Sequence, residues 1–174
     1  MIDIQTISIV LACASISIAA LYYSFTLRYT RMNLKNTLET RQAQLFMQIY
    51  TPFASKELQH CYRDAMLMQW ENYEDWRRKY YDQDSGSGRE AYESSLAISH
   101  YFEGIGMLVQ QGLLDISFVE SLMASHVIRL WTKMEPVVME RRKNIMRFGV
   151  FEHLEYLYRE LLEYEEKLGR PQTR

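Results

Sequence analysis

The residues best suited to chemistry are a few histidines and carboxylates at helical spacing. Glu57 and His60 form an E-x-x-H pattern, which places a carboxylate and an imidazole on adjacent turns of one helix face, as in di-iron bundles. That class of site needs a second E-x-x-H motif and two further carboxylates, and the sequence has only one such motif. We therefore expect no metal site and no cofactor.

Other enzyme signatures are missing from the sequence as well. It contains no G-x-S-x-G motif, no P-loop, no dinucleotide fingerprint and no H-E-x-x-H. Lys and Arg number 20 against 22 Asp and Glu, so the net charge of −2 gives no field that would attract nucleic acid. Cys13 and Cys61 lie far apart without metal-ligand spacing. These features indicate a protein that is not an enzyme and does not bind nucleic acid.

The segment YFEGIGMLVQQGLLD, from Tyr101 to Asp115, has two glycines in a stretch that otherwise reads as a helix. Gly104 and Gly106 each lie about 100° from Ile105 around the helix axis, one on either flank of an apolar stripe. A glycine inside a helix costs about 0.5 to 1 kcal/mol relative to alanine, a cost usually offset by close approach of another backbone. Both glycines are therefore predicted helix contacts. The stripe between them comprises Ile98, Tyr101, Phe102, Ile105, Leu108 and Val109.

Two polar residues, Glu103 and His126, fall among apolar neighbours and are predicted to be partly buried. A buried carboxylate needs a partner or must take up a proton. The candidate partners of Glu103 are His100, Arg129 and His126. We expect both Glu103 and His126 to be hydrogen-bonded structural residues, because buried polar groups normally are paired. A functional role for them remains open.

The elements that position these residues are predicted to be helices throughout. The chain has 7 Gly and 3 Pro among many unbranched side chains, a composition that favours an all-α fold. Thr51 and Pro52 resemble a helix start, and the DQDSGSG stretch is the strongest loop signal. Another helix is expected to begin near Asp115 or Ser117. The predicted bundle helices are about 53–81, 89–111, 115 or 117 onward with a kink at Pro136, and 150–168.

The N-terminal segment from Ile4 to Leu27 has no side chain that is charged at neutral pH. Its 24 residues would reach about 36 Å as a helix, enough to cross a hydrocarbon core of roughly 30 Å. The N-terminus lacks the basic residues of a cleaved signal peptide, so the segment is predicted to be an uncleaved anchor in the cell membrane. The basic residues that follow it predict an external N-terminus and a cytoplasmic C-terminal domain. They are Arg28, Arg31, Lys35 and Arg41.

One face of this anchor is rich in small residues. Ser8, Ala12, Ser15 and Ala19 recur at i, i+4, i+7 and i+11. Small side chains in lipid let another helix approach closely, so this face is a predicted contact with another membrane protein or with a second copy of the chain. The alternative is that these residues have no role, since such stripes are common in spanning helices.

The predicted organisation has four parts along the chain. Residues 1–27 form the transmembrane anchor, and residues 28–50 continue it as a juxtamembrane helical stalk. Residues 51–168 form a cytoplasmic bundle of about four helices, and residues 169–174 form a flexible tail.

The same segment, Tyr101 to Asp115, also carries a resemblance to a known family. Together with IRLWTKMEPVVMERR and FEHLEYL, it resembles an uncharacterised family of membrane-anchored helical proteins, the domain of unknown function 4760. The similarity extends over about 38–162, and its most specific parts are F-E-G-I-G and the Trp131 to Pro136 spacing. The resemblance implies a spanning helix ahead of a helical cytoplasmic domain, and it implies no activity.

These observations lead to one expected function with two alternatives. The expected function is that of a non-catalytic, single-pass membrane protein, acting as an interaction module or as an accessory subunit of a membrane complex. An oligomeric pore or gate remains an alternative, supported by the hydroxyls of Ser8 and Ser15 on one face. A membrane-tethered metal-dependent enzyme or sensor is a further alternative. The expected partners are the lipid membrane and a helix within it.

Overall fold

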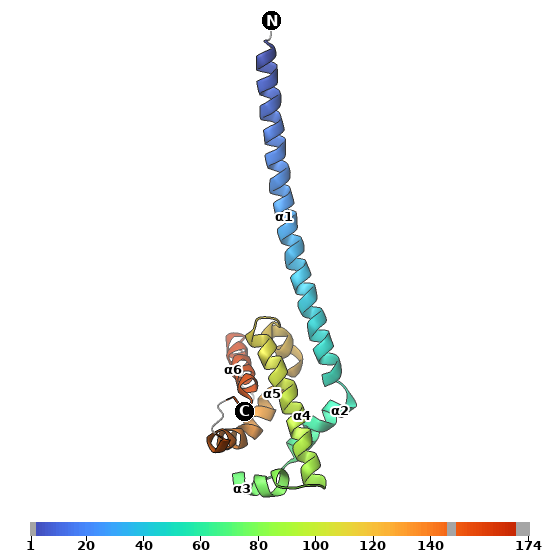
Figure 1. Cartoon of the computed structure of the whole chain (residues 1–174), viewed down its shortest axis with the longest axis vertical. Coiled ribbons are helices and arrows are strands. Elements are labelled where there is room, and N and C mark those ends of the chain that lie inside the picture. Colours follow the sequence, from blue (N-terminus) through green and yellow to red (C-terminus); the bar gives the residue numbers. More distant parts are fainter. Residues whose placement is uncertain (1–2, 146–148, 170–174) are drawn as a thin grey trace. The chain divides into compact units, whose positions relative to one another are not determined.

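The structure is a computed structural model that describes residues 3–145 and 149–169 (Figure 1). Every regular element in these two ranges is a helix, which confirms the predicted all-α class. The elements are α1 (Ile4–Phe53), α2 (Lys56–Leu67), α3 (Tyr73–Trp76), a π-helix η1 (Arg77–Tyr81), α4 (Ser87–Gln110), α5 (Ile116–Ile145) and α6 (Glu152–Lys167).

The chain divides into two units, residues 1–41 and residues 42–174. The first unit contains most of α1, and its side chains from Ile7 to Arg41 are exposed. The second unit contains the last turns of α1 and all the other helices. A long apolar N-terminal helix followed by a helical bundle is thus the observed fold. The folded unit begins at Gln42, earlier than the predicted bundle boundary at residue 51, because the end of α1 belongs to it.

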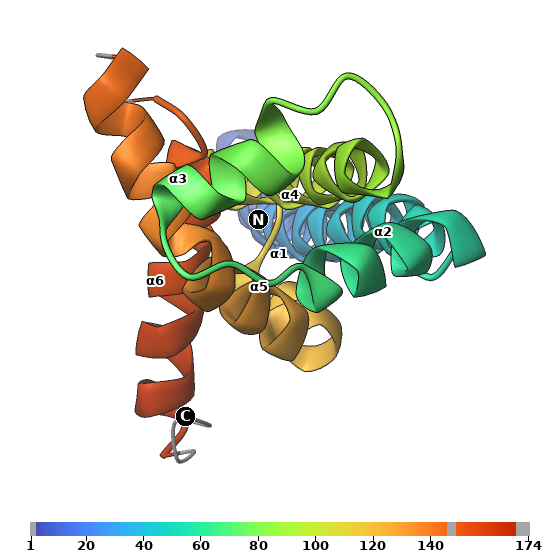
Figure 2. The same ribbon diagram turned by 90° about the horizontal axis from the view of Figure 1, so that it is seen from below.

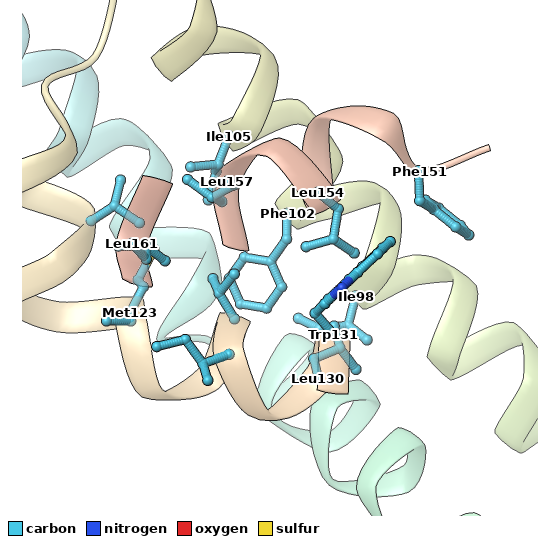
Figure 3. Close-up of a cluster of buried hydrophobic side chains, with 14 of the residues drawn as sticks. Ile98, Phe102, Ile105, Met123, Leu130, Trp131, Phe151, Leu154, Leu157 and Leu161 are labelled. Atoms are coloured by element: carbon cyan, nitrogen blue, oxygen red, sulfur yellow. The ribbon is translucent and has the colours of Figure 1, made fainter. Parts of the chain in front are cut away.

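Within the second unit, α6 packs against both α4 and α5, while α2 packs along α4. Their apolar faces form a large shared core (Figure 3), and a smaller buried cluster contains Trp76, Tyr92 and Val137. The stripe predicted on α4 is confirmed here, since Ile98, Phe102 and Ile105 are buried. The short α3 and the π-helix lie at one end of the bundle, against α5 and α4 respectively (Figure 2). The facing core residues from α5 and α6 include Met123, Leu130, Trp131, Leu154, Leu157 and Leu161.

The last turns of α1 are built into this core. Phe46 and Phe53 are buried, and the hydroxyl of Tyr101 on α4 donates a hydrogen bond to the Ile49 carbonyl. Burial raises the pKa of Tyr101 to about 12, so its hydroxyl stays a donor near neutral pH. The predicted helix start at Thr51 and Pro52 is wrong, because α1 runs through both residues and ends at Phe53.

The predicted helix over 53–81 is also wrong, because several shorter elements replace it. Ser55 caps α2 by accepting a hydrogen bond from the Leu58 N–H at 3.2 Å, and α2 ends at Leu67. Residues 68–72 are not helical, and Asn72 then caps α3. Helical spacing of apolar residues continues across this break, so the pattern alone could not locate it.

The remaining boundaries lie close to the predicted ones. Asp115 caps α5 by accepting hydrogen bonds from the N–H and the hydroxyl of Ser117, at 2.8 and 2.6 Å. α5 continues through Pro136 as far as Ile145. The predicted flexible tail, 169–174, lies outside the described residues except for Gly169.

Candidate functional site

The carboxylate of Glu103 contacts the N-terminus of α6. Its two oxygens accept hydrogen bonds from the backbone N–H groups of His153 and Leu154, at 3.3 and 2.7 Å. The residue that precedes α6, Phe151, has a left-handed backbone with φ of 55° and supplies no side-chain cap. Glu103 therefore caps α6 from another helix, and its negative charge also suits the positive end of the α6 dipole. Among the described residues, the groups that bind Glu103 are therefore these two N–H groups and none of the candidate partners His100, Arg129 and His126.

The two glycines that flank Ile105 have different surroundings. A Cβ added to Gly106 would lie 2.0 Å from the His153 carbonyl oxygen. Only glycine, which has no Cβ, therefore fits at this position beside the start of α6. A Cβ added to Gly104 would meet no heavy atom of the described residues within 4 Å. Gly106 thus allows the close approach that brings Glu103 to α6. Among the described residues, the close helix contact predicted at Gly104 is not found.

Arg142 on α5 binds the segment before α6, in addition to the contact that Glu103 makes from α4. Its Nε and Nη2 atoms donate to the Val150 carbonyl at 2.9 and 2.8 Å, and Nη1 lies 2.6 Å from Glu155 Oε2. Both side chains of this ion pair are mostly buried, with 14% and 21% of their surface exposed. The sequence places Arg142 in the basic run from Arg141 to Lys143, and nothing in that run distinguishes it as the residue that pairs with α6.

His126 lies between two aromatic rings from other helices. Its ring centroid is 5.1 Å from that of Phe53 at the end of α1, and 4.9 Å from that of Tyr62 on α2. Its Nδ1 atom is buried and has no hydrogen-bond partner among the described residues, and the same holds for the Tyr62 hydroxyl. The hydrogen bond predicted for His126 is therefore absent from the described structure. Burial, and then the nearby charge of Arg129, lower the pKa of His126.

His60, of the E-x-x-H pattern, pairs with Asp64 rather than with a metal-ligand set. His60 Nδ1 lies 2.8 Å from Asp64 Oδ2, which also accepts a hydrogen bond from the Ser94 hydroxyl at 3.1 Å. The pair borders an open pocket of about 300 Å³, together with Tyr80 and Glu90. Across residues 3–145 and 149–169, no three His, Cys, Asp or Glu side chains are grouped to hold a metal ion. The pair can orient an imidazole, and among the hydrogen bonds of the described residues the Ser94 hydroxyl contacts the Asp64 carboxylate rather than the His60 ring.

The predicted contact face of the anchor lies on the first unit. Ser8, Ala12, Ser15 and Ala19 are all exposed there. The Ser15 hydroxyl donates to the Leu11 carbonyl of its own helix at 2.8 Å, so it is satisfied without a second chain. By length and composition, α1 could cross a membrane, although some core helices of soluble proteins and signal sequences have the same character.

Comparison with known proteins identifies a family. No curated protein matches the chain. No solved structure matches it either. A family model, described as a domain of unknown function (DUF4760), matches residues 4–161 and so includes α1, Gly106 and most of α6. The chain therefore belongs to the DUF4760 family.

Proposed function

We propose that this protein is a single-pass membrane protein whose helical domain, residues 42–169, acts as a non-catalytic interaction module or accessory subunit of a membrane complex. The observation that carries the proposal is the character of α1, Ile4–Phe53. Its first part is apolar and exposed, and its last residues belong to the buried core of the domain. One helix thus serves both as anchor and as part of the fold, which suits a protein that works at a fixed place on a membrane.

The distribution of charge supports a cytoplasmic location for the domain. Arg28, Arg31, Lys35 and Arg41 follow the apolar segment, whereas the residues before it include Asp3 and no basic side chain. Basic residues near a spanning helix are enriched on the cytoplasmic side. The proposal therefore has the N-terminus outside the cell.

The anchor itself is the proposed contact with a partner. The face of Ser8, Ala12, Ser15 and Ala19 has no bulky side chain, so a second helix in the membrane could pack closely against it. The proposed occupant is a spanning helix of another membrane protein or of a second copy of this chain. The Ser15 hydroxyl already bonds to its own helix, which favours a packing surface over a water-filled pore.

Affinity purification in mild detergent, followed by mass spectrometry and crosslinking, tests this proposal. The double substitution Ala12→Leu and Ala19→Leu should reduce retention of a membrane partner, or self-association, because larger side chains separate the helices. The control is Ala14→Leu with Ser17→Leu, which adds bulk on the opposite face of the same helix. Equal retention by both double variants would contradict the contact face. Recovery of the wild-type chain as a monomer without a membrane partner would contradict the interaction role.

A further inference from the structure

We propose that His126 makes the contact between the end of α1 and the bundle sensitive to acid. Neutral His126 packs between the rings of Phe53 and Tyr62, and its protonation loosens this packing. Three helices meet at this residue: Phe53 is the last residue of α1, Tyr62 belongs to α2, and His126 belongs to α5. This inference concerns the domain alone, and it holds whether or not a partner binds α1.

The surroundings of the His126 ring combine edge-to-face aromatic contacts with a buried nitrogen that has no partner among the described residues. The planes of His126 and Phe53 meet at 85°, and those of His126 and Tyr62 meet at 64°. Edge-to-face packing of this kind is favourable between neutral rings. Both nitrogens of a protonated imidazole are donors, and Nδ1 is buried without a partner among the described residues, so the charged ring would hold a donor there with nothing to accept its hydrogen bond.

The groups that face His126 do not neutralise an added charge. From α1 the neighbour is the apolar ring of Phe53, and from α2 it is the ring of Tyr62. Burial raises the pKa of Tyr62, so its hydroxyl stays neutral in acid and supplies no negative charge. From α5 itself, one turn away, the neighbour is the cation Arg129. Within the described part of the chain, His126 forms no ion pair with a carboxylate.

The sign of the pH effect follows from these surroundings. The folded protein lowers the pKa of His126 below its ordinary 6.5, so the unfolded chain binds the proton more readily. The stabilising contribution is complete above the unfolded pKa and is lost as the pH falls from there through the folded value. Opening of the contact with Phe53 and Tyr62 would return the ring to water. Acid therefore favours release of the last turn of α1 from the bundle.

Hydrogen exchange with mass spectrometry on the full chain in detergent micelles tests the proposal. Peptides from residues 44–62 cover the contact, and peptides from α6 serve as an internal reference. On acidification from about pH 7.5 to about pH 5.5, after correction for intrinsic exchange, we expect protection of 44–62 to fall several-fold more than that of α6. The substitution His126→Phe, which keeps a ring but cannot take a proton, should abolish this difference. The control His60→Gln, at an exposed histidine, should retain it.

A second variant preserves the test if His126→Phe does not fold. Arg129 is exposed, and Arg129→Gln removes a cation that helps to lower the pKa of His126, so acidification should cost residues 44–62 less protection than in the wild type. The proposal is overturned if wild-type peptides from 44–62 and α6 lose protection equally. It is also overturned if His126→Phe retains the loss of protection, or if Arg129→Gln loses as much protection in acid as the wild type.

Discussion

Glu103 and Leu154 are joined by a 2.7 Å hydrogen bond from the Leu154 N–H to the Glu103 carboxylate, across 51 positions of sequence. The same carboxylate accepts a bond from His153, so both oxygens serve the first turn of α6. Gly106, one turn further along α4, allows the His153 carbonyl to approach. The F-E-G-I-G segment therefore acts as a docking point for α6, and this explains why a carboxylate and a glycine occur together in a core helix.

Removal of the carboxylate should destabilise the domain. Glu103→Ala is expected to lower the free energy of unfolding by about 0.5 to 2 kcal/mol, the range for loss of a helix cap. Glu103→Gln should cost less, because the amide oxygen keeps one acceptor. Urea denaturation of the full chain in detergent, followed by circular dichroism, gives these values. Glu93→Ala is the matched control on the same helix, since its exposed ion pair with Arg89 contributes under about 1 kcal/mol. Equal effects at Glu93 and Glu103 would show that the cap contributes nothing specific.

The two neighbouring glycines should respond in opposite directions to the same substitution. Gly106→Ala places a methyl group against the His153 carbonyl and should cost about 1 to 3 kcal/mol. Gly104→Ala meets open space inside a helix and should stabilise the domain by about 0.5 to 1 kcal/mol. Thermal denaturation of the two variants beside the wild type measures both. A Gly106→Ala variant as stable as the wild type would refute the close contact with α6.

Arg142 should be poorly replaced by lysine. Arg142→Lys keeps the charge but loses the planar group that bonds the Val150 carbonyl through two nitrogens and Glu155 through the third. We expect a loss of about 1 to 3 kcal/mol in the free energy of unfolding, as for hydrogen bonds to charged groups. Lys143→Ala removes an exposed ion pair with Glu140 and should change stability by less than about 1 kcal/mol. If Arg142→Lys and Lys143→Ala change the free energy of unfolding in urea by the same amount, the bonds from Arg142 to Val150 and Glu155 do not stabilise the packing of α6 on α5.

Local patterns in the sequence were enough to predict the all-α class and the buried face of α4. The stripe through Ile98, Phe102 and Ile105 follows the helical period, and Gly106 borders it as a contact residue would. The helical period could not show which of Gly104 and Gly106 makes the close contact, because both lie at the same angle from Ile105, on opposite sides. Only the position of α6 distinguishes them.

Long-range polar partners were beyond prediction from the sequence. The groups that Glu103 binds are backbone N–H groups, which every residue except proline carries, so no residue type marks them. For the same reason, no residue type in the sequence marks the Val150 carbonyl as the acceptor of the hydrogen bond from Arg142. Thr51 and Pro52 led to a wrong prediction of a helix start. Phe53 follows them and is a buried core residue of α1, and burial of its ring extends the helix through the local start signal.

Cysteine accessibility in intact cells is the most direct test of the central claim, that α1 spans the membrane and keeps the domain in the cytoplasm. In a background with Cys13→Ser and Cys61→Ser, single cysteines are introduced as Asp3→Cys before α1 and Ser85→Cys in the exposed loop before α4. A membrane-impermeant maleimide should label Asp3→Cys in intact cells, and Ser85→Cys only after permeabilisation. Labelling of Ser85→Cys in intact cells would reverse the orientation. Recovery of the full chain in the soluble fraction would contradict the anchor itself.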